Sequence, residues 1–281
     1  MKKIIHYIPS ILSILVIVFG TLGFLFAPND PEHVDVSSHL ISHCKEYPLG
    51  TDALGRCVLS RVLYGGFTTL GIVLLGSIIV IFIGTFIGIF LGTNKEGKNI
   101  VFESILNAVT AIPPIAYLII FISAWGNSVF TMIVALTVSL VLRMIKIIKT
   151  KTEIEYKKAY VLCAISSGAS TFRVLFVHIM PNVVRDALHF VCLSAGEMIL
   201  SISGFSFIGL SLGDSVIDWG GMVSEGRNYI STNPGLMFYP MIFIFICVFA
   251  FNILARELEK GGHIYAWGKK FDCNFKKSTI N

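Results

Sequence analysis

The chain has 281 residues, of which 54% are hydrophobic and only 14% are charged, and its mean hydropathy is +0.78. These values exclude an ordinary soluble domain and are typical of a protein that crosses a membrane several times. The formal net charge of +5 is spread over several loops rather than gathered on one face, so it does not indicate nucleic-acid binding. Six cysteines occur without a Cys-x-x-Cys pair, so neither a zinc site nor a redox motif is predicted.

An apolar run begins soon after the N-terminus. Residues 8–27 are long enough to supply the about 20 residues of a spanning helix. Lys2 and Lys3 precede the run and favour a cytosolic N-terminus. The run is too long for a removable signal peptide and lacks a small-residue cleavage site. Residues 1–27 are therefore predicted to be the first transmembrane helix.

A polar segment, residues 28–66, follows and is predicted to lie outside the cell. It contains three histidines and a cysteine, namely His33, His39, His43 and Cys44. Their spacing matches no standard ligand motif, so solvated side chains are the favoured interpretation and no metal site is predicted. Cys44 and Cys57 share this segment and could form a disulfide, and chance placement is the alternative.

The end of that segment carries a polar motif with two glycines, which reads Leu-Gly-Thr-Asp-Ala-Leu-Gly-Arg. Gly50 and Gly55 permit tight turns, and Asp52 is placed to cap the helix that follows. Arg56 and Arg61 are expected at the outer membrane surface. The motif residues singled out as an external site are Gly50, Thr51, Asp52, Gly55 and Arg56.

Residues 67–93 are uncharged and rich in glycine, and they form the second predicted span. Gly84 and Gly88 have the Gly-x-x-x-Gly spacing that lets two helices approach closely in a membrane. Residues 92–99 come close to the sequence of a phosphate-binding loop. However, Asn99 stands where a magnesium-binding Ser or Thr is needed, and a membrane span precedes the loop in place of a buried strand. The segment is therefore interpreted as a basic cytosolic turn.

Two further spans follow. Residues 100–124 form a span that Pro113 and Pro114 interrupt, and such prolines are tolerated where protein or cavity water satisfies the freed carbonyls. The interruption is either a pore-lining kink or a packing kink. Residues 127–142 form the fourth span, and the basic residues after it place the next segment in the cytosol. These are Arg143, Lys146, Lys149 and Lys151.

Residues 149–182, which we call the elbow segment, are predicted to fold as two short helices with a break between them. Each helix has one face with helical spacing. The first face comprises Tyr156, Ala159, Tyr160 and Cys163, and the second comprises Phe172, Leu175, Phe176 and Ile179. Gly168 breaks the chain between the helices, and Pro181 ends the second and can open the next. This arrangement makes a docking surface rather than a catalytic pocket, and a linker lying on its own bundle is the alternative.

The fifth predicted span covers residues 183–212. Glu197 lies near its middle, where a carboxylate is costly and faces a cavity or a polar partner. Glu197 and Ser201 are therefore candidates for a translocation path, and a hydrogen-bonded contact between helices is the alternative for Glu197. His189 allows the same two interpretations. The loop that follows is predicted to be external and holds the acidic residues Asp214, Asp218 and Glu225.

The sixth predicted span comprises residues 237–254 and opens around Pro240. Residues 257–281 hold several lysines and are predicted to be a loosely ordered cytosolic tail. The chain thus divides into a first helix, an outer loop, a transmembrane domain over residues 67–256 and a tail.

The elbow segment resembles the cytoplasmic coupling loop of permease subunits of bacterial ABC importers. That family has a glutamate, two alanines, a glycine and a Pro-Asn pair at fixed spacing. The residues that fit in identity and spacing are Gly168, Ala169, Ser170, Pro181 and Asn182. Ala164 stands at the second alanine and Cys163 at the first. Ala159 stands at the glutamate position, and Glu155, one turn earlier, is a hypothetical substitute.

The outer motif resembles a segment of one subgroup, the second permease subunit of peptide and nickel importers. Cys57 stands where that subgroup has aspartate, so an Arg–Asp pairing there is lost or moved. Residues 204–210 and 218–230 are similar to the same subgroup. The resemblance covers about residues 49–254.

The resemblance implies an all-α polytopic membrane protein with six transmembrane helices, in a bacterial cytoplasmic membrane with both termini cytosolic. It implies a permease without enzymatic activity or cofactor, which pairs with a similar second permease and two cytosolic ATPase chains and receives cargo from an external binding protein. The cargo would be di- or oligopeptides, nickel or metal chelates. The residues expected at the ATPase contact are Glu155, Ala159, Tyr160, Cys163, Ala164, Gly168, Ala169, Ser170, Pro181 and Asn182. The competing classes are an ATP-independent channel or carrier, which needs no docking elbow, and a membrane-embedded enzyme, which needs a second acidic group facing Glu197.

Overall fold

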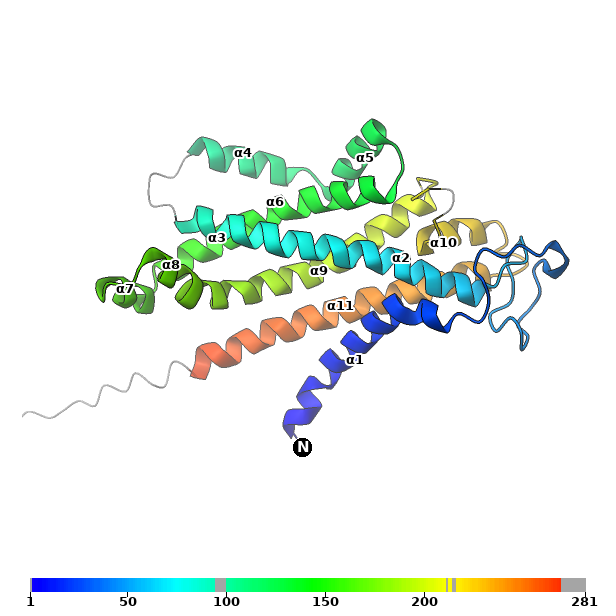
Figure 1. Ribbon diagram of the computed structural model, residues 1–281, viewed down its shortest axis with the longest axis horizontal. Coiled ribbons are helices and arrows are strands. Elements are labelled where there is room, and N and C mark those ends of the chain that lie inside the picture. Colours follow the sequence, from blue (N-terminus) through cyan, green and yellow to red (C-terminus); the bar gives the residue numbers. More distant parts are fainter. Residues whose placement is uncertain (1, 94–99, 211, 214–215, 269–281) are drawn as a thin grey trace, which may run out of the picture.

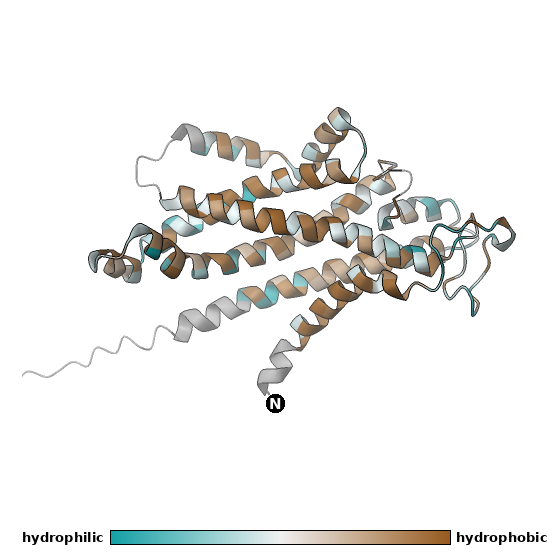
Figure 2. Ribbon diagram, viewed as in Figure 1, coloured by the Kyte–Doolittle hydropathy of each residue, from teal (hydrophilic) through white to brown (hydrophobic). Residues whose placement is uncertain are grey.

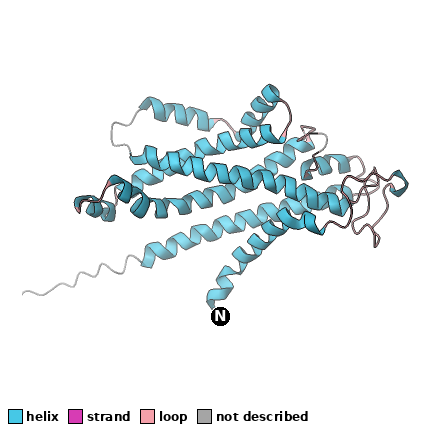
Figure 3. Cartoon of the chain, viewed as in Figure 1, coloured by secondary structure: helices cyan, strands magenta, loops and turns pink. Residues whose placement is uncertain are grey.

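The fold is a bundle of long helices (Figure 1). The computed structural model describes residues 2–93, 100–210, 212–213 and 216–268, and these residues form helices and loops without a strand (Figure 3). The α-helices are α1 (Lys2–Leu22), α2 (Val58–Ile79), α3 (Thr85–Thr93), α4 (Ile100–Ala111), α5 (Pro114–Trp125), α6 (Val129–Tyr156), α7 (Ala159–Ser166), α8 (Thr171–Arg173), α9 (Met180–Phe207), α10 (Trp219–Arg227) and α11 (Gly235–Gly268). The all-α prediction is confirmed.

Several of these helices can cross a membrane. Within the described chain, the stretches that are long and apolar enough are Ile8–Phe26, Val58–Thr93, Val129–Tyr156, Thr171–Phe207 and Gly235–Glu259. Helices α4 and α5 pass the same test only as a pair, and they meet at 81°. When this pair is counted as one broken span, the chain has the six predicted spans.

The bend between α4 and α5 is sharper than the predicted kink. Pro113 has an extended backbone (φ −61°, ψ 145°), and Pro114 is the first residue of α5. A residue before proline avoids the helical region, and proline has no N–H to donate. Helix α5 packs against α6, and its residues Leu118 and Ile122 are buried. Pro113 itself is exposed and Pro114 is half-buried, so the prolines interrupt the span at the edge of the bundle.

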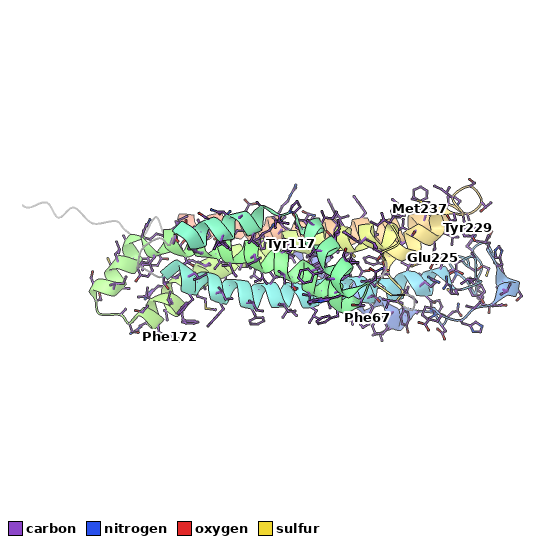
Figure 4. All side chains as sticks on the ribbon, turned by 90° about the horizontal axis from the view of Figure 1, so that it is seen from above. Phe67, Tyr117, Phe172, Glu225, Tyr229 and Met237 are labelled. Atoms are coloured by element: carbon purple, nitrogen blue, oxygen red, sulfur yellow. The ribbon has the colours of Figure 1, made fainter. Side chains whose placement is uncertain are left out.

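The two ends of the bundle differ. Helices α7 and α8 lie at one end, on the same side as the C-terminal ends of α3 and α11, and we call this the elbow end (Figure 1). Helix α10 and the loop over residues 27–57 lie at the opposite end, the α10 end, and Figure 2 shows hydrophilic residues gathered there. Figure 4 gives a second view, with Phe172 at the elbow end and Glu225 and Tyr229 at the α10 end.

Glycines in α3 and in the π segment before it, Val80–Gly84, bring this span close to α6. A Cβ atom added at Gly84 would overlap the side chain of Met144. A Cβ atom added at Gly88 would lie 2.7 Å from Cβ of Ile148 and 3.1 Å from the carbonyl oxygen of Ile145. The close helix contact predicted from the Gly-x-x-x-Gly spacing is confirmed.

Replacing Gly88 by alanine is expected to lower the free energy of unfolding by about 1–3 kcal/mol, because the added methyl group overlaps Ile148 across a packed interface. Gly71→Ala is the matched control, since a Cβ atom added at Gly71 has no neighbour within 4 Å. The melting temperatures of the two variants in detergent measure the difference. Equal melting temperatures would contradict the close packing of α3 and α6.

Helices α2, α6, α9 and α11 have boundaries that differ from the predicted spans. Helices α6, α9 and α11 run over Val129–Tyr156, Met180–Phe207 and Gly235–Gly268, against predicted spans at 127–142, 183–212 and 237–254. The second predicted span, 67–93, ends where the continuous helical stretch Val58–Thr93 ends, but that stretch begins earlier, with α2 at Val58. Helices α6 and α11 continue because the charged residues that follow their apolar parts are good helix formers, and Lys149 lies 3.6 Å from Glu153 at i, i+4. Helix α9 ends early because Gly209 adopts φ +92°.

The predicted start and tail of the last span also need correction. Pro240 lies inside α11, since the carbonyls of Asn233 and Pro234 already accept from the first amides of that helix. Residues 257–268, predicted to be part of a loosely ordered tail, are helical. Residues 269–281 lie outside the described chain.

Candidate functional site

Gly168 forms the break in the elbow segment. Its φ is +84°, a conformation that glycine adopts at little cost. Its N–H donates to the carbonyl oxygen of Ile165 at 2.9 Å, and the N–H of Ala169 donates to that of Ala164 at 3.0 Å. This pair of bonds is the Schellman arrangement that ends a helix. The predicted break at this glycine is confirmed.

The first predicted face is divided between two helices, and α7 packs on the bundle through Val161. Val161 is fully buried, whereas Ala159, Tyr160 and Cys163 are exposed. Tyr156 belongs to α6 instead. Residues 157–158 form a turn between α6 and α7. The turn resets the helical phase, so residues before and after it cannot share one face.

A wider π turn follows α8. Ser170 caps α8 by accepting from the N–H of Arg173 at 3.4 Å. Residues 174–179 then bond in the π pattern, and helical structure continues from Thr171 to Phe207. Pro181 therefore opens α9, where it occupies the first turn, but it does not end the preceding helical stretch as predicted. Proline has no N–H to donate, and the wider hydrogen-bond pattern of the π turn accommodates this missing donor.

The second predicted face is divided between the bundle and the outside. Leu175 and Ile179 are buried, but Phe172 is 69% exposed and Phe176 is 39% exposed. The rings of Phe172 and Phe176 lie 4.4 Å apart between centroids, and Figure 4 shows Phe172 at the elbow end. The π turn changes the angular spacing of side chains, so the predicted four-residue face is wrong for the two phenylalanines.

A hydrogen-bonded cluster, which we call the Glu155 brace, joins three parts of the elbow segment. The hydroxyl of Tyr160 donates to Glu155 Oε2 at 2.6 Å. Asn182 Nδ2 donates to the Tyr160 oxygen at 3.0 Å and to the carbonyl oxygen of His178 at 2.8 Å. Lys158 also pairs with Glu155. Burial and the Glu155 carboxylate raise the pKa of Tyr160 above its ordinary value, so its hydroxyl remains a donor.

The residues expected at an ATPase contact lie mostly on the surface of the elbow end. The exposed ones are Ala159, Tyr160, Cys163, Gly168, Ser170, Pro181 and Asn182, and the half-buried ones are Glu155, Ala164 and Ala169.

Four charged side chains meet at the α10 end, and we call them the ionic cluster. Asp52 Oδ2 accepts from Arg56 Nε at 2.8 Å and from Arg61 Nη1 at 3.0 Å. Glu225 Oε2 accepts from Arg56 Nη2 and from Arg61 Nη2, both at 3.1 Å. Arg61 is buried, with 4% of its surface exposed. The cluster therefore ties the outer loop, α2 and α10 together.

The turns of the outer motif agree with the prediction. Gly50 and Gly55 have φ values of +78° and +73°. A Cβ atom added at Gly55 would overlap the carbonyl oxygen of Asp35, so this position requires glycine. Thr51 is fully buried, and its hydroxyl oxygen accepts from the N–H of Ile41 at 2.8 Å.

Asp52 does not cap α2. Cys57 occupies the N-cap position and makes no side-chain cap bond. Asp52 Oδ1 instead accepts from the N–H groups of Leu54 at 2.9 Å and Arg56 at 3.0 Å, because the tight turn folds the chain back over its own carboxylate. Cys57 stands where the resembling subgroup has aspartate, so it cannot pair with an arginine. In this chain Asp52 pairs with Arg56 and Arg61 instead. Both Cys57, which is buried, and Cys44, which is exposed, are free thiols.

Helix α10 is clamped against the bundle rather than lying in a free loop. Trp219 is fully buried, and its Nε1 donates to the carbonyl oxygen of Val62 in α2 at 2.9 Å. Asp218 caps α10 by accepting from the N–H of Gly221 at 3.0 Å, and burial raises the pKa of Asp218. A cavity of about 360 Å³ lies beside the ionic cluster, lined in part by Asp52, Arg56, Met222, Glu225, Tyr229 and Leu236.

The polar residues of the fifth span have separate partners. Glu197 is exposed, and its carboxylate lies 3.9 Å from Arg143 Nη1 in α6. Ser201 donates to the carbonyl oxygen of Glu197 at 2.8 Å, which is a bond within α9. His189 Nδ1 lies 2.9 Å from the carbonyl oxygen of Ala255 in α11. His189 therefore makes a contact between helices, while Glu197 both faces outward and approaches a neighbouring helix.

Two features of the sequence bear on metal binding and on phosphate binding. Within the described ranges, no group of three or more His, Cys, Asp or Glu residues could hold a metal ion. Residues 94–99, which complete the sequence close to a phosphate-binding loop, and the acidic residue Asp214 lie outside those ranges.

Comparison with known proteins decides the family. Residues 81–261 match the family described as binding-protein-dependent transport system inner membrane component. The chain belongs to this family. It is a multi-pass permease subunit of an ABC importer in the inner membrane.

Three curated permeases are similar to this permease over most of their length. The nickel transport system permease protein NikC of Escherichia coli (strain K12) is 28% identical over 232 residues, which cover 83% of this chain and 84% of that protein. The oligopeptide transport system permease protein OppC of Bacillus subtilis is 26% identical over 254 residues, 89% of this chain and 83% of that one. The metal-staphylopine import system permease protein CntC of Staphylococcus aureus is 28% identical over 263 residues, which cover 92% of this chain and 91% of that protein.

A solved structure has the same fold. An inward-facing structure of the MetNI methionine ABC transporter superposes with a TM-score of 0.58 and covers 72% of this chain and 96% of that chain. The sequence identity is 16%, so this likeness shows the fold alone.

Two partners in this permease were missed by reasoning from the sequence. Glu225 was noted only as an acidic loop residue, yet it pairs with Arg56 and Arg61. Arg143 was interpreted only as a marker of the cytosolic side, yet it approaches Glu197. In both cases the signal was a charge next to an apolar span that required a partner of opposite sign.

Proposed function

We propose that this permease forms half of the translocation path of an ATP-driven importer and that its elbow segment is the surface on which a separate ATPase chain docks. The observation that carries the proposal is the exposed apolar surface at the elbow end, on the loop between α6 and α9. Its residues are Tyr160, Leu162, Phe172, Phe176 and Val177. An apolar patch with polar surroundings is typical of a protein interaction site.

The proposed orientation follows from charge. Basic residues at the elbow end, among them Lys157, Lys158 and Arg173, favour a cytosolic location. With six spans, the N-terminus and α11 then also end in the cytosol, and the α10 end faces outward. A similar second permease, two ATPase chains and an external binding protein complete the proposed importer, with the binding protein meeting the Gly50–Arg56 motif and the ionic cluster.

The proposed mechanism uses the elbow segment as a lever. Helices α6 and α9 leave the bundle at the elbow end and are joined there by α7 and α8 (Figure 1). Closure of an ATPase pair would move residues 153–170 as a unit and tilt α6 and α9, which would switch the path from inward-facing to outward-facing. ATP shifts this equilibrium because it binds one of the two states more tightly.

The proposed path runs along exposed and half-buried positions of the spans. Glu197 and Ser201 on α9 and the break at Pro113 and Pro114 are the candidates in this chain. For cargo we propose di- or oligopeptides, nickel or a metal chelate, since the similar permeases are named for nickel, oligopeptide and metal-staphylopine transport.

Gly168→Trp tests the docking surface. A Cβ atom added at Gly168 has no neighbour within 4 Å and Gly168 is exposed, so the substitution places bulk on the surface and adds a backbone cost of about 1–2 kcal/mol at positive φ. We expect the variant to insert in the membrane but to lose the copurifying ATPase and at least about tenfold of its ATP-driven uptake.

Gly209→Trp is the matched control. Gly209 also ends a helix at positive φ (+92°), and a Cβ atom added there also has no neighbour within 4 Å, but it lies at the α10 end. This control should retain the ATPase. Normal uptake and normal ATPase retention in the Gly168 variant would count against the proposal.

A further inference from the structure

The exposure of Glu197 is unusual for its place in the chain. Its side chain is 63% exposed, and its neighbours on the outer surface of α9 are Leu193 and Leu200. Phe207 ends this helix, and ten residues of α-helix rise about 15 Å. Glu197 therefore lies about halfway through a membrane of about 30 Å. A carboxylate facing hydrocarbon at that depth is costly, so this surface is covered by protein or by water.

The contacts of Glu197 leave its carboxylate available. Arg143 is 3.9 Å away, at the limit of an ion pair, and its side chain is 31% exposed. Ser201 bonds to the backbone of Glu197 rather than to the carboxylate. Glu197 is thus about twice as exposed as its basic partner, and the outer surface of the pair presents negative charge.

A second ion pair bridges the same two helices. Lys151 Nζ in α6 lies 3.3 Å from Asp186 Oδ2 in α9, and both side chains are partly exposed. Asp186 and Glu197 are eleven residues apart in the sequence, which is about three helical turns, so the two carboxylates share one face of α9. On this face Glu197 lies near Arg143 of α6, and Asp186 lies near Lys151 of α6. The elbow segment joins these two helices, so a movement of the elbow that shifts α6 against α9 would change both pairs.

We propose that Glu197 is a binding site for a positively charged group on the cargo, either a metal cation or an ammonium group, and that Arg143 is the counter-ion it exchanges. This inference rests on the proposed function. Tilting α6 against α9 lengthens the 3.9 Å contact and frees the carboxylate, and a cation then takes the place of the guanidinium. A carboxylate oxygen accepts charge-assisted hydrogen bonds from an ammonium group and is a ligand for hard divalent cations. An anionic cargo would meet the more exposed carboxylate first and be repelled.

The local charge can be measured without knowing the cargo. Ser201→Cys places a thiol one helical turn from Glu197, in the importer assembled with its partner chains. We compare its rate of modification by a cationic and by an anionic methanethiosulfonate reagent of similar size. The parent chain sets the blank, since it has the exposed thiols Cys44 and Cys163. The ratio of cationic to anionic rates is expected to fall about tenfold or more when Glu197→Gln is added, since one charge within several ångströms changes each rate.

Three results would overturn the inference. A thiol that reacts with neither reagent would show that this surface is sealed by protein or lipid. An equal rate ratio with and without Glu197→Gln would show that the carboxylate does not select charge. Loss of the second permease from Glu197→Gln would make Glu197 an assembly contact. Failure of the proposed function is seen separately, as an assembly that retains no ATPase chain.

Discussion

Replacing Arg61 by methionine is expected to lower the free energy of unfolding by about 3 kcal/mol. Arg61 is the most buried member of the ionic cluster, and it donates to Asp52 at 3.0 Å and to Glu225 at 3.1 Å. Its removal leaves the buried carboxylate of Asp52 and the half-exposed carboxylate of Glu225 with one guanidinium between them. Breaking a buried ion pair from one side costs about 3–5 kcal/mol. The lower end applies here because Arg56 still bonds to both acids.

Arg56→Met is the matched control for Arg61→Met. Its side chain is 19% exposed against 5% for Arg61, so it is better solvated and its loss should cost about 1 kcal/mol. Thermal unfolding in detergent compares the two variants. An equal loss of stability in both would show that burial does not decide the contribution of each arginine to the cluster.

The loss of unfolding free energy caused by Arg61→Met should depend on pH. Burial already raises the pKa of Glu225 in the intact protein, and removing a guanidinium raises it further. An acid whose pKa is higher in the folded state takes up protons on folding, so stability increases as pH falls. The difference between Arg61→Met and the parent should therefore shrink as the pH is lowered from neutral toward that pKa. Adding Glu225→Gln to Arg61→Met should recover part of the loss at neutral pH.

Features set by a single residue type were predicted well from the sequence. A glycine that must take positive φ ends a helix wherever it stands, so the break at Gly168 follows from local chemistry. Gly84 and Gly88 predict close helix contact because small side chains at helical spacing have that effect in any membrane helix. The spans themselves follow from hydropathy and length.

Features that depend on the phase of a helix were predicted poorly. One turn at residues 157–158 and one π segment at residues 174–179 change the angle between side chains, and neither has a clear sequence signal. A regular 3.6-residue period therefore grouped Tyr160 with Tyr156, and Phe172 with Leu175, on shared faces that the chain does not form. Helix ends were misplaced for another reason: hydropathy falls at the membrane surface, while helix propensity continues into the charged residues beyond it.

Pairings over long sequence distance were not predictable from local pattern. Arg61 and Glu225 stand 164 residues apart, and nothing near either of them indicates the other. Only the fold, which brings α10 back against α2, makes the pair.

Replacing Tyr160 by phenylalanine is expected to lower ATP-driven uptake about tenfold. The Tyr160 hydroxyl is the centre of the Glu155 brace: it donates to Glu155 at 2.6 Å and accepts from Asn182 at 3.0 Å. A hydrogen bond to a charged group contributes about 1.5–3 kcal/mol, and solvent at this partly exposed site favours the lower figure. About 1.4 kcal/mol shifts a two-state equilibrium tenfold, so the ratio of the braced to the unbraced elbow should fall about tenfold.

The control is Ser167→Ala in the same loop. Ser167 bonds only within its own helix among the contacts described, to the carbonyl oxygen of Cys163 at 2.8 Å, so its loss leaves the brace intact and uptake near that of the parent. Uptake is measured in proteoliposomes that contain the importer assembled with the parent chain, with Tyr160→Phe or with Ser167→Ala. Uptake of Tyr160→Phe within twofold of the parent would show that the brace does not transmit movement.

Variants of the Glu155 brace distinguish two roles for Glu155, a contact with the ATPase and a contact within the elbow segment. If its carboxylate contacts the ATPase in place of the glutamate that Ala159 lacks, Glu155→Gln should release the ATPase while Tyr160→Phe retains it. The geometry favours the other result. The side chain of Glu155 is only 15% exposed and holds Lys158 and Tyr160, so Glu155→Gln and Tyr160→Phe should reduce uptake alike and leave the ATPase bound. Because both variants remove one shared interaction, the double variant should transport about as well as either single one.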